Sequence, residues 1–290
     1  MKFKLVLLTV VGLAAIFVVF HNFVSTESAL RLIGEIENRK AFEFELPDSN
    51  LCNGIRLNLK SAIAIDNESH EVLYCYNADN IVPIASISKL ITAMVVLDNY
   101  QPDSIISISA EDSFGSSRSI FRTGDQATVR DMLHASLIRS DNRATRALAR
   151  FMGGTIDNFV VKVNEKIHNI GLENTVMYEP TGLDDRNRST AADCAKLINH
   201  AMLYQEITRI TSLQQYSFSL TNRKKIKNIV NTNKLVFSKY KILAGKTGYI
   251  SESAYCLTTI IEDEKGKKKK MITGLKIAPI MSALISSVPR

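Results

Sequence analysis

Tryptophan is absent from this chain of 290 residues, and cysteine and proline are scarce, with four and six residues. No two cysteines lie two to four residues apart, so the usual zinc-binding spacings are excluded. Repeats and low-complexity segments are also missing, and 46% hydrophobic residues are ample for a core, so the chain is globular rather than disordered.

The four cysteines allow three disulfide pairings in an oxidising compartment, and the sequence does not decide among them. Cys75 and Cys256 lie in strand-like runs, where a buried thiol is the default expectation. The other two are Cys52 and Cys194.

Acidic residues are fewer than basic ones, 29 against 36, which gives a formal net charge of +7 and a pI near 9.1. This balance favours anionic surroundings such as a membrane surface or a polyanionic wall, and it also permits nucleic acid. The densest basic run, residues 262–270, lies between two apolar stretches around Gly266. It predicts a solvated hairpin tip without a functional role.

The N-terminus carries Lys2 and Lys4 before an apolar block from Leu5 to Phe20, the order typical of an export signal. As a helix the block spans ~24 Å, less than a ~30 Å hydrocarbon core. No clean cleavage site follows, although residues 26–28 are a tolerable substitute. Residues 1–28 are therefore a cleaved signal or a retained membrane anchor, and export argues against nucleic acid as a partner.

The remaining chain predicts an α+β fold. Residues 29–58 resemble a linker or peripheral segment, and residues 61–77 predict a β-hairpin around "DNES". Helical signals dominate from about 101 to 224, and strand signals return from about 225. Strands at both ends with helices between them predict one antiparallel sheet flanked by helices, with an inserted all-helical subdomain.

Ser86 and Lys89 precede and begin a run that is apolar on nearly every side of a helical wheel, so the helix is expected to be buried. Residues i and i+3 share a helical face, which brings the hydroxyl and the amine together. Burial disfavours an ammonium, so Lys89 can act as a neutral base that activates Ser86 as a nucleophile. The alternative is an ordinary helix start with a capping serine and a solvated lysine.

Ser-x-x-Lys alone is a weak signal, because about one copy is expected by chance in a chain of this length. A second copy, Ser238 to Lys241, lies in a polar stretch and is interpreted as noise. Two further motifs strengthen the first. Ser140-Asp141-Asn142 lies in a break between two predicted helices, and Lys246-Thr247-Gly248 lies in a predicted strand.

These three motifs, in this order, resemble the low-molecular-weight penicillin-binding D-alanyl-D-alanine peptidases, relatives of the serine β-lactamases. The segments "EPTGLDDRN", "NTNKLV" and "GKTGYISESAYCL" also resemble that family, especially its endopeptidase branch. The resemblance runs from about residue 58 to 276, and it implies a catalytic domain over 59–290 and a periplasmic location.

The resemblance also implies residue roles. Ser86 would be acylated, Lys89 would accept its proton, and Ser140 and Asn142 would relay the proton and hold the substrate. Lys246 and Thr247 would bind a substrate carboxylate, and the N–H groups of Ser86 and Tyr249 would form the oxyanion hole. Gly248 completes the substrate-binding strand, β-lactams would be covalent inhibitors, and no metal or cofactor is required.

The chain departs from the family at its end, where residues 277–290 are expected to form at most one small helix on the sheet. A Ser-His-Asp site is not excluded by composition, but the histidines occupy ordinary helical or turn positions. Endopeptidase action on peptidoglycan cross-links is the leading interpretation. The alternatives are a carboxypeptidase on pentapeptide stems, a β-lactamase, and an inactive wall-binding protein.

Overall fold

The computed structural model describes residues 42–46, 59–115, 118–262 and 269–277. The chain divides into two compact units, Met1–Glu43 and Phe44–Arg290, and every element below belongs to the second. Within the described ranges no helix is long and apolar enough to cross a membrane. The predicted export segment, the tip of the basic run and the tail after Ile277 lie outside the described residues.

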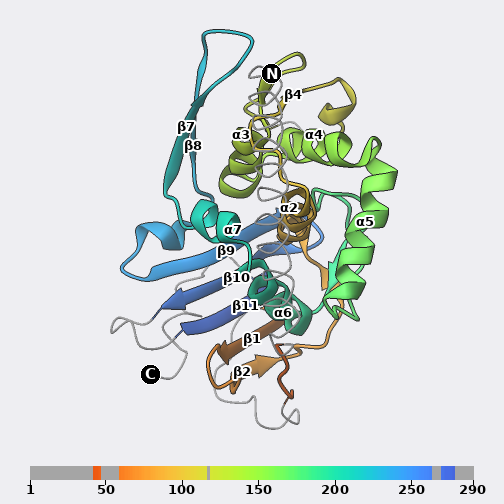
Figure 1. The fold of residues 1–290 in the computed structure, drawn as a ribbon. Helices are drawn as coiled ribbons and strands as arrows, with labels where there is room; N and C mark the ends of the chain where they lie inside the picture. Colours follow the sequence, from red (N-terminus) through yellow and green to blue (C-terminus); the bar gives the residue numbers. More distant parts are fainter. Residues whose placement is uncertain (1–41, 47–58, 116–117, 263–268, 278–290) are drawn as a thin grey trace, which may run out of the picture. The chain divides into compact units, whose positions relative to one another are not determined.

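A five-stranded sheet forms the base of the second unit, in the order β2-β1-β11-β10-β9 (Figure 1). Every neighbouring pair is antiparallel, and the first strand of the chain pairs with the last. The sequence-based prediction of an antiparallel sheet closed by strands from both ends is therefore confirmed. The strands are β1 (Ser61–Asp66), β2 (Val72–Tyr76), β9 (Lys241–Ile250), β10 (Ala254–Glu262) and β11 (Lys269–Ile277).

The β1–β2 hairpin follows from its turn residues. Asp66 ends β1, and its carboxylate accepts hydrogen bonds from the backbone N–H groups of Glu68 and Ser69. Asp and Asn stabilise turns in this way by replacing backbone partners. All six residues of β1 are buried, so this strand is covered on both faces.

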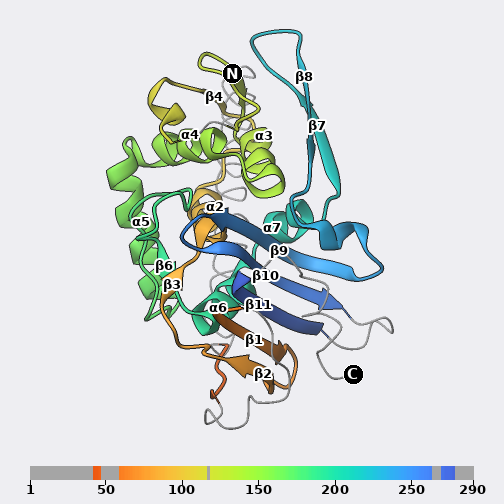
Figure 2. The same ribbon diagram turned by 180° about the vertical axis from the view of Figure 1, so that it is seen from behind.

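Helices cover one face of the sheet (Figures 1 and 2). α6 (Ala191–Ala201) packs on β1, β10 and β11, and α7 (Gln205–Thr211) packs on β9. α2 (Lys89–Asp98) lies between α6 and the outer helices α4 (Asn142–Gly153) and α5 (Ile156–Asn169). This position explains why its residues from Lys89 to Val96 are all buried, as its all-round apolarity predicts.

The helical region begins with α3 (Val129–His134), which runs into the π-helix η3 (Ala135–Arg139). Thr128 caps α3 by accepting a hydrogen bond from the Asp131 N–H, which stabilises the start of the helix. Short elements elsewhere are β3 (Val82–Pro83), β6 (Arg188–Ser189), and the 3₁₀ turns η1 (Ala85–Ser88), η2 (Glu111–Ser113) and η4 (Lys234–Phe237).

The region expected to be all helical also contains strands. β4 (Ile105–Ser107) pairs with β5 (Gln126–Thr128), and β7 (Gln215–Ser219) pairs with β8 (Ile226–Val230). The β7–β8 hairpin stands away from the sheet, as both ribbon views show. β8 itself lies beyond the expected helical region, where strand signals return from about 225, and its burial alternates residue by residue as in a half-buried strand.

Cysteine chemistry partly differs from the expectation. Cys75 is disulfide-bonded, so the expected thiol in this strand was wrong, whereas Cys256 in β10 carries a buried thiol. Cys75 lies in β2, which is an edge strand of the sheet. Cys194 in α6 is also a buried thiol.

Candidate active site

Ser86 lies in the turn η1, directly before α2, which agrees with its predicted place at the start of a buried helix. Two glycines allow other segments of the chain to approach this backbone closely. A Cβ at Gly182 would lie 1.9 Å from the Ala85 carbonyl oxygen, and one at Gly248 would lie 2.8 Å from the Ser86 nitrogen. Two distant segments therefore contact the backbone of Ser86 at distances that only glycine allows.

The capping alternative for this serine is not supported. Neither η1 nor α2 has a side-chain cap hydrogen bond at its start. Instead, the Ser86 hydroxyl lies 2.9 Å from the Lys89 amine. Ser86 is only half-buried, so the hydroxyl is both accessible and paired with a base.

Lys89 is completely buried, and its Nζ has three oxygen partners. They are Ser86 Oγ at 2.9 Å, Asn142 Oδ1 at 2.7 Å and the Thr181 carbonyl at 2.5 Å. A neutral amine has two N–H donors and one lone pair, and the carbonyl oxygens of Asn142 and Thr181 can only accept. Both N–H groups therefore point to these carbonyls, which leaves the lone pair for the Ser86 hydroxyl.

Burial shifts Lys89 toward this neutral form. Burial lowers the pKa of the amine from 10.5 to about 8, and the carboxylates of Glu179 and Asp141 oppose part of that decrease. The amine can thus exchange a proton near physiological pH. The sequence-based argument that an all-apolar helix would weaken the charge on Lys89 agrees with this result.

Ser140 and Asn142 occupy the break between η3 and α4. Ser140 ends the π-helix in a left-handed conformation with φ of 62°, a geometry that π-helical segments often support at functional sites. Asp141 caps α4, and its carboxylate also accepts from the Ser119 hydroxyl and the Ile120 N–H. This carboxylate fixes the turn that presents Ser140 and Asn142 to the two lysines.

Lys246 extends from β9 into the same site. Its Nζ lies 3.0 Å from Ser140 Oγ and 2.7 Å from the Thr247 carbonyl. The pKa of this amine is lowered well below its ordinary value, first by complete burial and then by the charge of Lys89. The Thr247 hydroxyl is hydrogen-bonded to that of Thr232 at 2.8 Å.

The structure thus brings most of the sequence-predicted residues together. Ser86, Lys89 and Asn142 form one hydrogen-bonded group, and Ser140 and Lys246 form a second beside it. Gly248 contacts the Ser86 backbone, and the neighbouring Tyr249 has a 58% exposed ring stacked at a tilt on Tyr255. The catalytic roles of these residues remain predictions.

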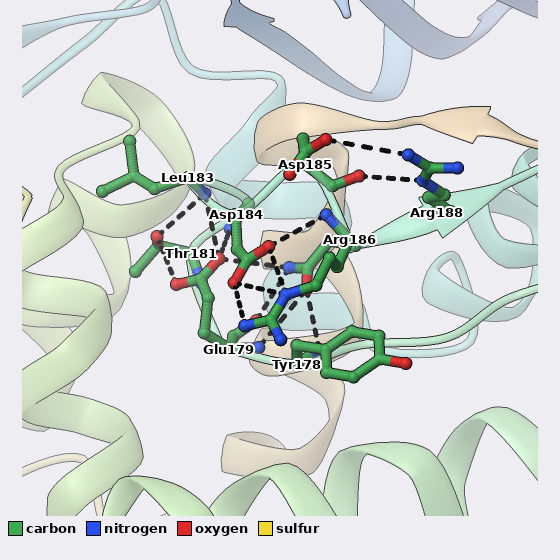
Figure 3. Close-up of polar contacts among 10 residues, drawn as sticks. Tyr178, Glu179, Thr181, Leu183, Asp184, Asp185, Arg186 and Arg188 are labelled. Atoms are coloured by element: carbon green, nitrogen blue, oxygen red, sulfur yellow. Dashed lines mark hydrogen bonds and ion pairs between the residues drawn. The ribbon is translucent and has the colours of Figure 1, made fainter. Parts of the chain in front are cut away.

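The loop from Tyr178 to Arg188 also contributes to the site, since its Thr181 carbonyl accepts from Lys89, and no roles were predicted for its residues. Figure 3 shows the polar contacts within this loop. Glu179 accepts hydrogen bonds from the N–H groups of Thr181, Gly182 and Leu183, and from the Thr181 hydroxyl. The buried Asn187 donates to the same carboxylate and to Ser88. Gly182, with φ of 83°, was the one local signal of a special backbone here.

Other sequence candidates lie outside the site. Lys241, in the second Ser-x-x-Lys copy, is 71% exposed and pairs with Glu262. His134 is buried in α3, stacked on Tyr216 and hydrogen-bonded to the Arg130 carbonyl. Within the described part of the chain, no cluster of three or more His, Cys, Asp and Glu side chains is arranged to hold a metal ion.

Comparison with known families points the same way. The model of a family described as D-alanyl-D-alanine carboxypeptidase matches residues 50–273. A D-alanyl-D-alanine endopeptidase of Pseudomonas aeruginosa is 37% identical over 202 residues, covering 68% of this chain and 65% of the relative. A D-alanyl-D-alanine endopeptidase of Escherichia coli is 34% identical, covering 70% and 68%.

Two further relatives extend the comparison. A D-alanyl-D-alanine carboxypeptidase of Bacillus subtilis is 31% identical, covering 74% of this chain and 57% of the relative. The solved structure of a Streptomyces K15 DD-transpeptidase variant is 25% identical with a TM-score of 0.75, covering 81% of this chain and 97% of that one. The chain spans somewhat less than two thirds of the Pseudomonas and Bacillus proteins.

Proposed function

The chain belongs to the D-alanyl-D-alanine carboxypeptidase family, and from this membership we propose that it is a serine peptidase acting on D-alanyl peptide bonds of peptidoglycan. The resemblance seen in the three sequence motifs is therefore confirmed at the level of the family. The observation that carries the proposed activity is the 2.9 Å contact between the buried Lys89 amine and the Ser86 hydroxyl.

The reaction proceeds in two steps. Lys89 takes the proton of Ser86 while Oγ attacks the D-alanyl carbonyl, and the N–H groups of Ser86 and Tyr249 stabilise the oxyanion. The C–N bond then breaks, and the leaving amine takes a proton relayed through Ser140. Water hydrolyses the ester in the second step, which releases the D-alanyl carboxylate and restores the Ser86 hydroxyl.

Lys246 and Thr247 bind a carboxylate of the substrate. Both lie on β9 beside the nucleophile, and a carboxylate would restore the charge that burial and Lys89 disfavour on Lys246. Asn142 has two tasks, because its side chain accepts from Lys89 and lies where the substrate backbone would pass.

Penicillin labelling tests the site. A fluorescent penicillin is expected to acylate the wild type and to leave Ser86→Ala unlabelled, because the variant has no nucleophilic oxygen. Ser238→Ala is the matched control, because Ser238 belongs to the second Ser-x-x-Lys copy. This variant is expected to be labelled like the wild type. Equal labelling of wild type and Ser86→Ala would overturn the assignment.

Endopeptidase action on cross-links is the preferred form of this activity, since the Pseudomonas and Escherichia relatives carry that name. Carboxypeptidase action is the second candidate, because the family description and the Bacillus relative favour it. Mass analysis of muropeptides separates them. Monomers released from cross-linked dimers indicate an endopeptidase, and loss of one D-alanine from pentapeptides indicates a carboxypeptidase. Binding to murein sacculi without either product would indicate a wall-binding protein.

A β-lactamase needs a group that activates water against the acyl-enzyme. Glu179 is the carboxylate on the loop beside Ser86, and its two oxygens already accept five hydrogen bonds from protein groups. A carboxylate engaged in this way has little capacity left for a water molecule. We therefore expect a long-lived penicillin adduct, and rapid turnover of a chromogenic cephalosporin would contradict it.

Export of the protein is part of the proposal. The order of two lysines and an apolar block within residues 1–28 supports translocation to the periplasm, with the segment either cleaved or kept as an anchor. Residues 29–58 would then connect it to a catalytic domain over 59–290. Peptidoglycan peptides and β-lactams are the partners that this location provides, and nucleic acid is not expected there.

A further inference from the structure

The loop beside the nucleophile contains an acidic residue for which the catalytic steps above have no use. We propose that Glu179 is a positioning residue for Lys89, which aims the Thr181 carbonyl at the amine and offsets the burial of its charge. This inference rests on the proposed function, since it concerns the base of that reaction.

Geometry provides the first support. Glu179 Oε2 accepts from the Thr181 N–H at 2.9 Å and from the Thr181 hydroxyl at 2.6 Å, while Oε1 accepts from the Gly182 and Leu183 N–H groups. Three consecutive N–H groups thus converge on one carboxylate. The Thr181 C=O and the Gly182 N–H belong to the same planar peptide unit, so holding the Gly182 N–H on Glu179 restricts the direction of the carbonyl.

The direction of that carbonyl matters for the reaction. Thr181 O and Asn142 Oδ1 are the two acceptors that take the N–H groups of a neutral Lys89, and together they turn its lone pair toward Ser86. If the Thr181 carbonyl moved away, one N–H would be free to point at Ser86 Oγ. The amine would then donate to the hydroxyl instead of accepting its proton.

The loop is also fixed from its other end. Asn187 is fully buried, accepts from the Tyr178 N–H, donates to the Glu179 carbonyl, and reaches Ser88 beside the nucleophile. Further along the loop, Asp184 pairs with Arg186, whose guanidinium lies 4.6 Å from the Tyr178 ring (Figure 3). These contacts leave the Glu179 carboxylate facing inward onto the backbone of residues 181–183.

Charge provides the second support. Three charged groups face Lys89 from different elements: Glu179 from the loop, Asp141 from the start of α4, and Lys246 from β9. Glu179 is the larger of the two influences that raise the pKa of Lys89 against burial. Without it, the amine would lose its proton at lower pH, and it would be less able to hold the proton taken from Ser86.

The test is the pH dependence of acylation by a fluorescent penicillin, measured as a second-order rate constant from mildly acidic to alkaline pH. For the wild type the rate is expected to rise through a midpoint near pH 8, where Lys89 becomes neutral. Glu179→Gln removes the charge and keeps the shape. Its midpoint is expected to move to lower pH by roughly half a unit or more, with a lower plateau rate because the amide N–H₂ opposes the backbone N–H groups.

Two further variants separate charge from structure. Glu179→Asp keeps the charge with a shorter side chain, so its plateau rate is expected to fall while its midpoint stays at the wild-type position. Asp185→Asn is the matched control, because Asp185 lies in the same loop and its carboxylate pairs with the half-exposed Arg188 at 3.7 Å. It is expected to leave both quantities unchanged.

The outcomes are decisive in each direction. A Glu179→Gln midpoint equal to that of the wild type overturns the proposal, even if the plateau rate falls. If Glu179→Gln does not fold, Glu179→Asp decides the question. A pH midpoint of acylation at the wild-type position, together with a reduced plateau rate, supports the proposal. A displaced midpoint overturns it. Failure of the proposed function would look different, because the wild type itself would not be acylated at any pH.

Discussion

Two buried lysines, Lys89 and Lys246, define the chemistry of the site at the scale of single residues. Burial lowers the pKa of both amines, and the charge of Lys89 lowers that of Lys246 further. Their hydrogen-bond partners then distinguish them. Lys89 contacts the Ser86 hydroxyl, whereas Lys246 contacts Ser140 and faces the side of β9 where a substrate carboxylate would bind.

Gly182 provides a residue-scale prediction. In Gly182→Ala the new Cβ would overlap the Ala85 carbonyl, and since the atoms it meets are backbone, they cannot rotate away. Penicillin acylation is expected to fall roughly tenfold or more, because the loop would be displaced from Ser86 and Lys89. The measurement is the acylation rate at room temperature, together with the thermal unfolding midpoint.

Gly171→Ala is the control for that substitution. Gly171 has a similarly positive φ of 69°, but a Cβ added there would meet nothing within 4 Å beyond its chain neighbours in the described part of the chain. Strain alone is expected to cost roughly 1–2 kcal/mol of unfolding free energy, with acylation unchanged. Equal loss of acylation in both alanine variants would show that backbone strain, rather than contact with Ala85, explains the effect.

Asp141 acts at the scale of an element, since one carboxylate caps α4 and ties the preceding Ser119–Ile120 segment to it. Asp141→Ala would leave buried N–H groups unpaired, with an expected loss of roughly 2–4 kcal/mol of unfolding free energy. Acylation is expected to fall as well, because the turn also positions Ser140 and Asn142. Urea denaturation and penicillin labelling measure the two effects.

Thr155→Ala offers a comparison with the same chemistry in another helix. Thr155 caps α5 at an exposed position, where its hydroxyl oxygen accepts one hydrogen bond from the Asn158 N–H. A loss of about 1 kcal/mol without any change in acylation is expected. If this variant impaired acylation as strongly as Asp141→Ala, helix stability in general would account for both results.

Most elements could be predicted from local patterns. The capped start of α3, the buried α2 and the strand that carries Lys246 all depend on residues adjacent in the sequence. The strand β7 was missed because its residues are mostly polar and exposed, whereas its partner β8 lies where strands were expected. The Ser86–Lys89 pair was found because three residues separate its members, whereas the contact of Lys89 with Thr181 spans 92 residues and has no local signature.

At the scale of the whole molecule, strands from early and late in the sequence pair in one sheet, and the helices that carry the site pack on that sheet. The site residues come from η1, α2, α4, β9 and the loop that leads into β6. The site therefore forms only when these parts have folded together. The cost of burying Lys89, the proposed catalytic base, is therefore a cost to the stability of the whole unit. This coupling leads to a prediction about its pH dependence.

The folded pKa of Lys89, about 8, lies below the ordinary value of 10.5 that applies in the unfolded chain. Between these values the unfolded state binds more protons, so stability rises with pH through this window. Below the folded pKa the full free-energy cost of burying the charged amine is present, and it is about 3 kcal/mol for this shift in pKa. Wild-type stability is thus expected to increase from about pH 8 to pH 10.5 relative to a variant without the amine.

Lys89→Met is that variant, because it keeps the apolar stem and cannot be protonated. Urea denaturation of both proteins at roughly one-unit steps from neutral pH to about pH 10 measures the difference in unfolding free energy. Burial, the larger cause of the lowered pKa of Lys246, is common to both proteins, and only the smaller effect of the Lys89 charge on Lys246 differs between them. A difference that stays constant across this range would mean that Lys89 keeps an ordinary pKa in the folded protein, and it would remove the electrostatic basis for its role as the base.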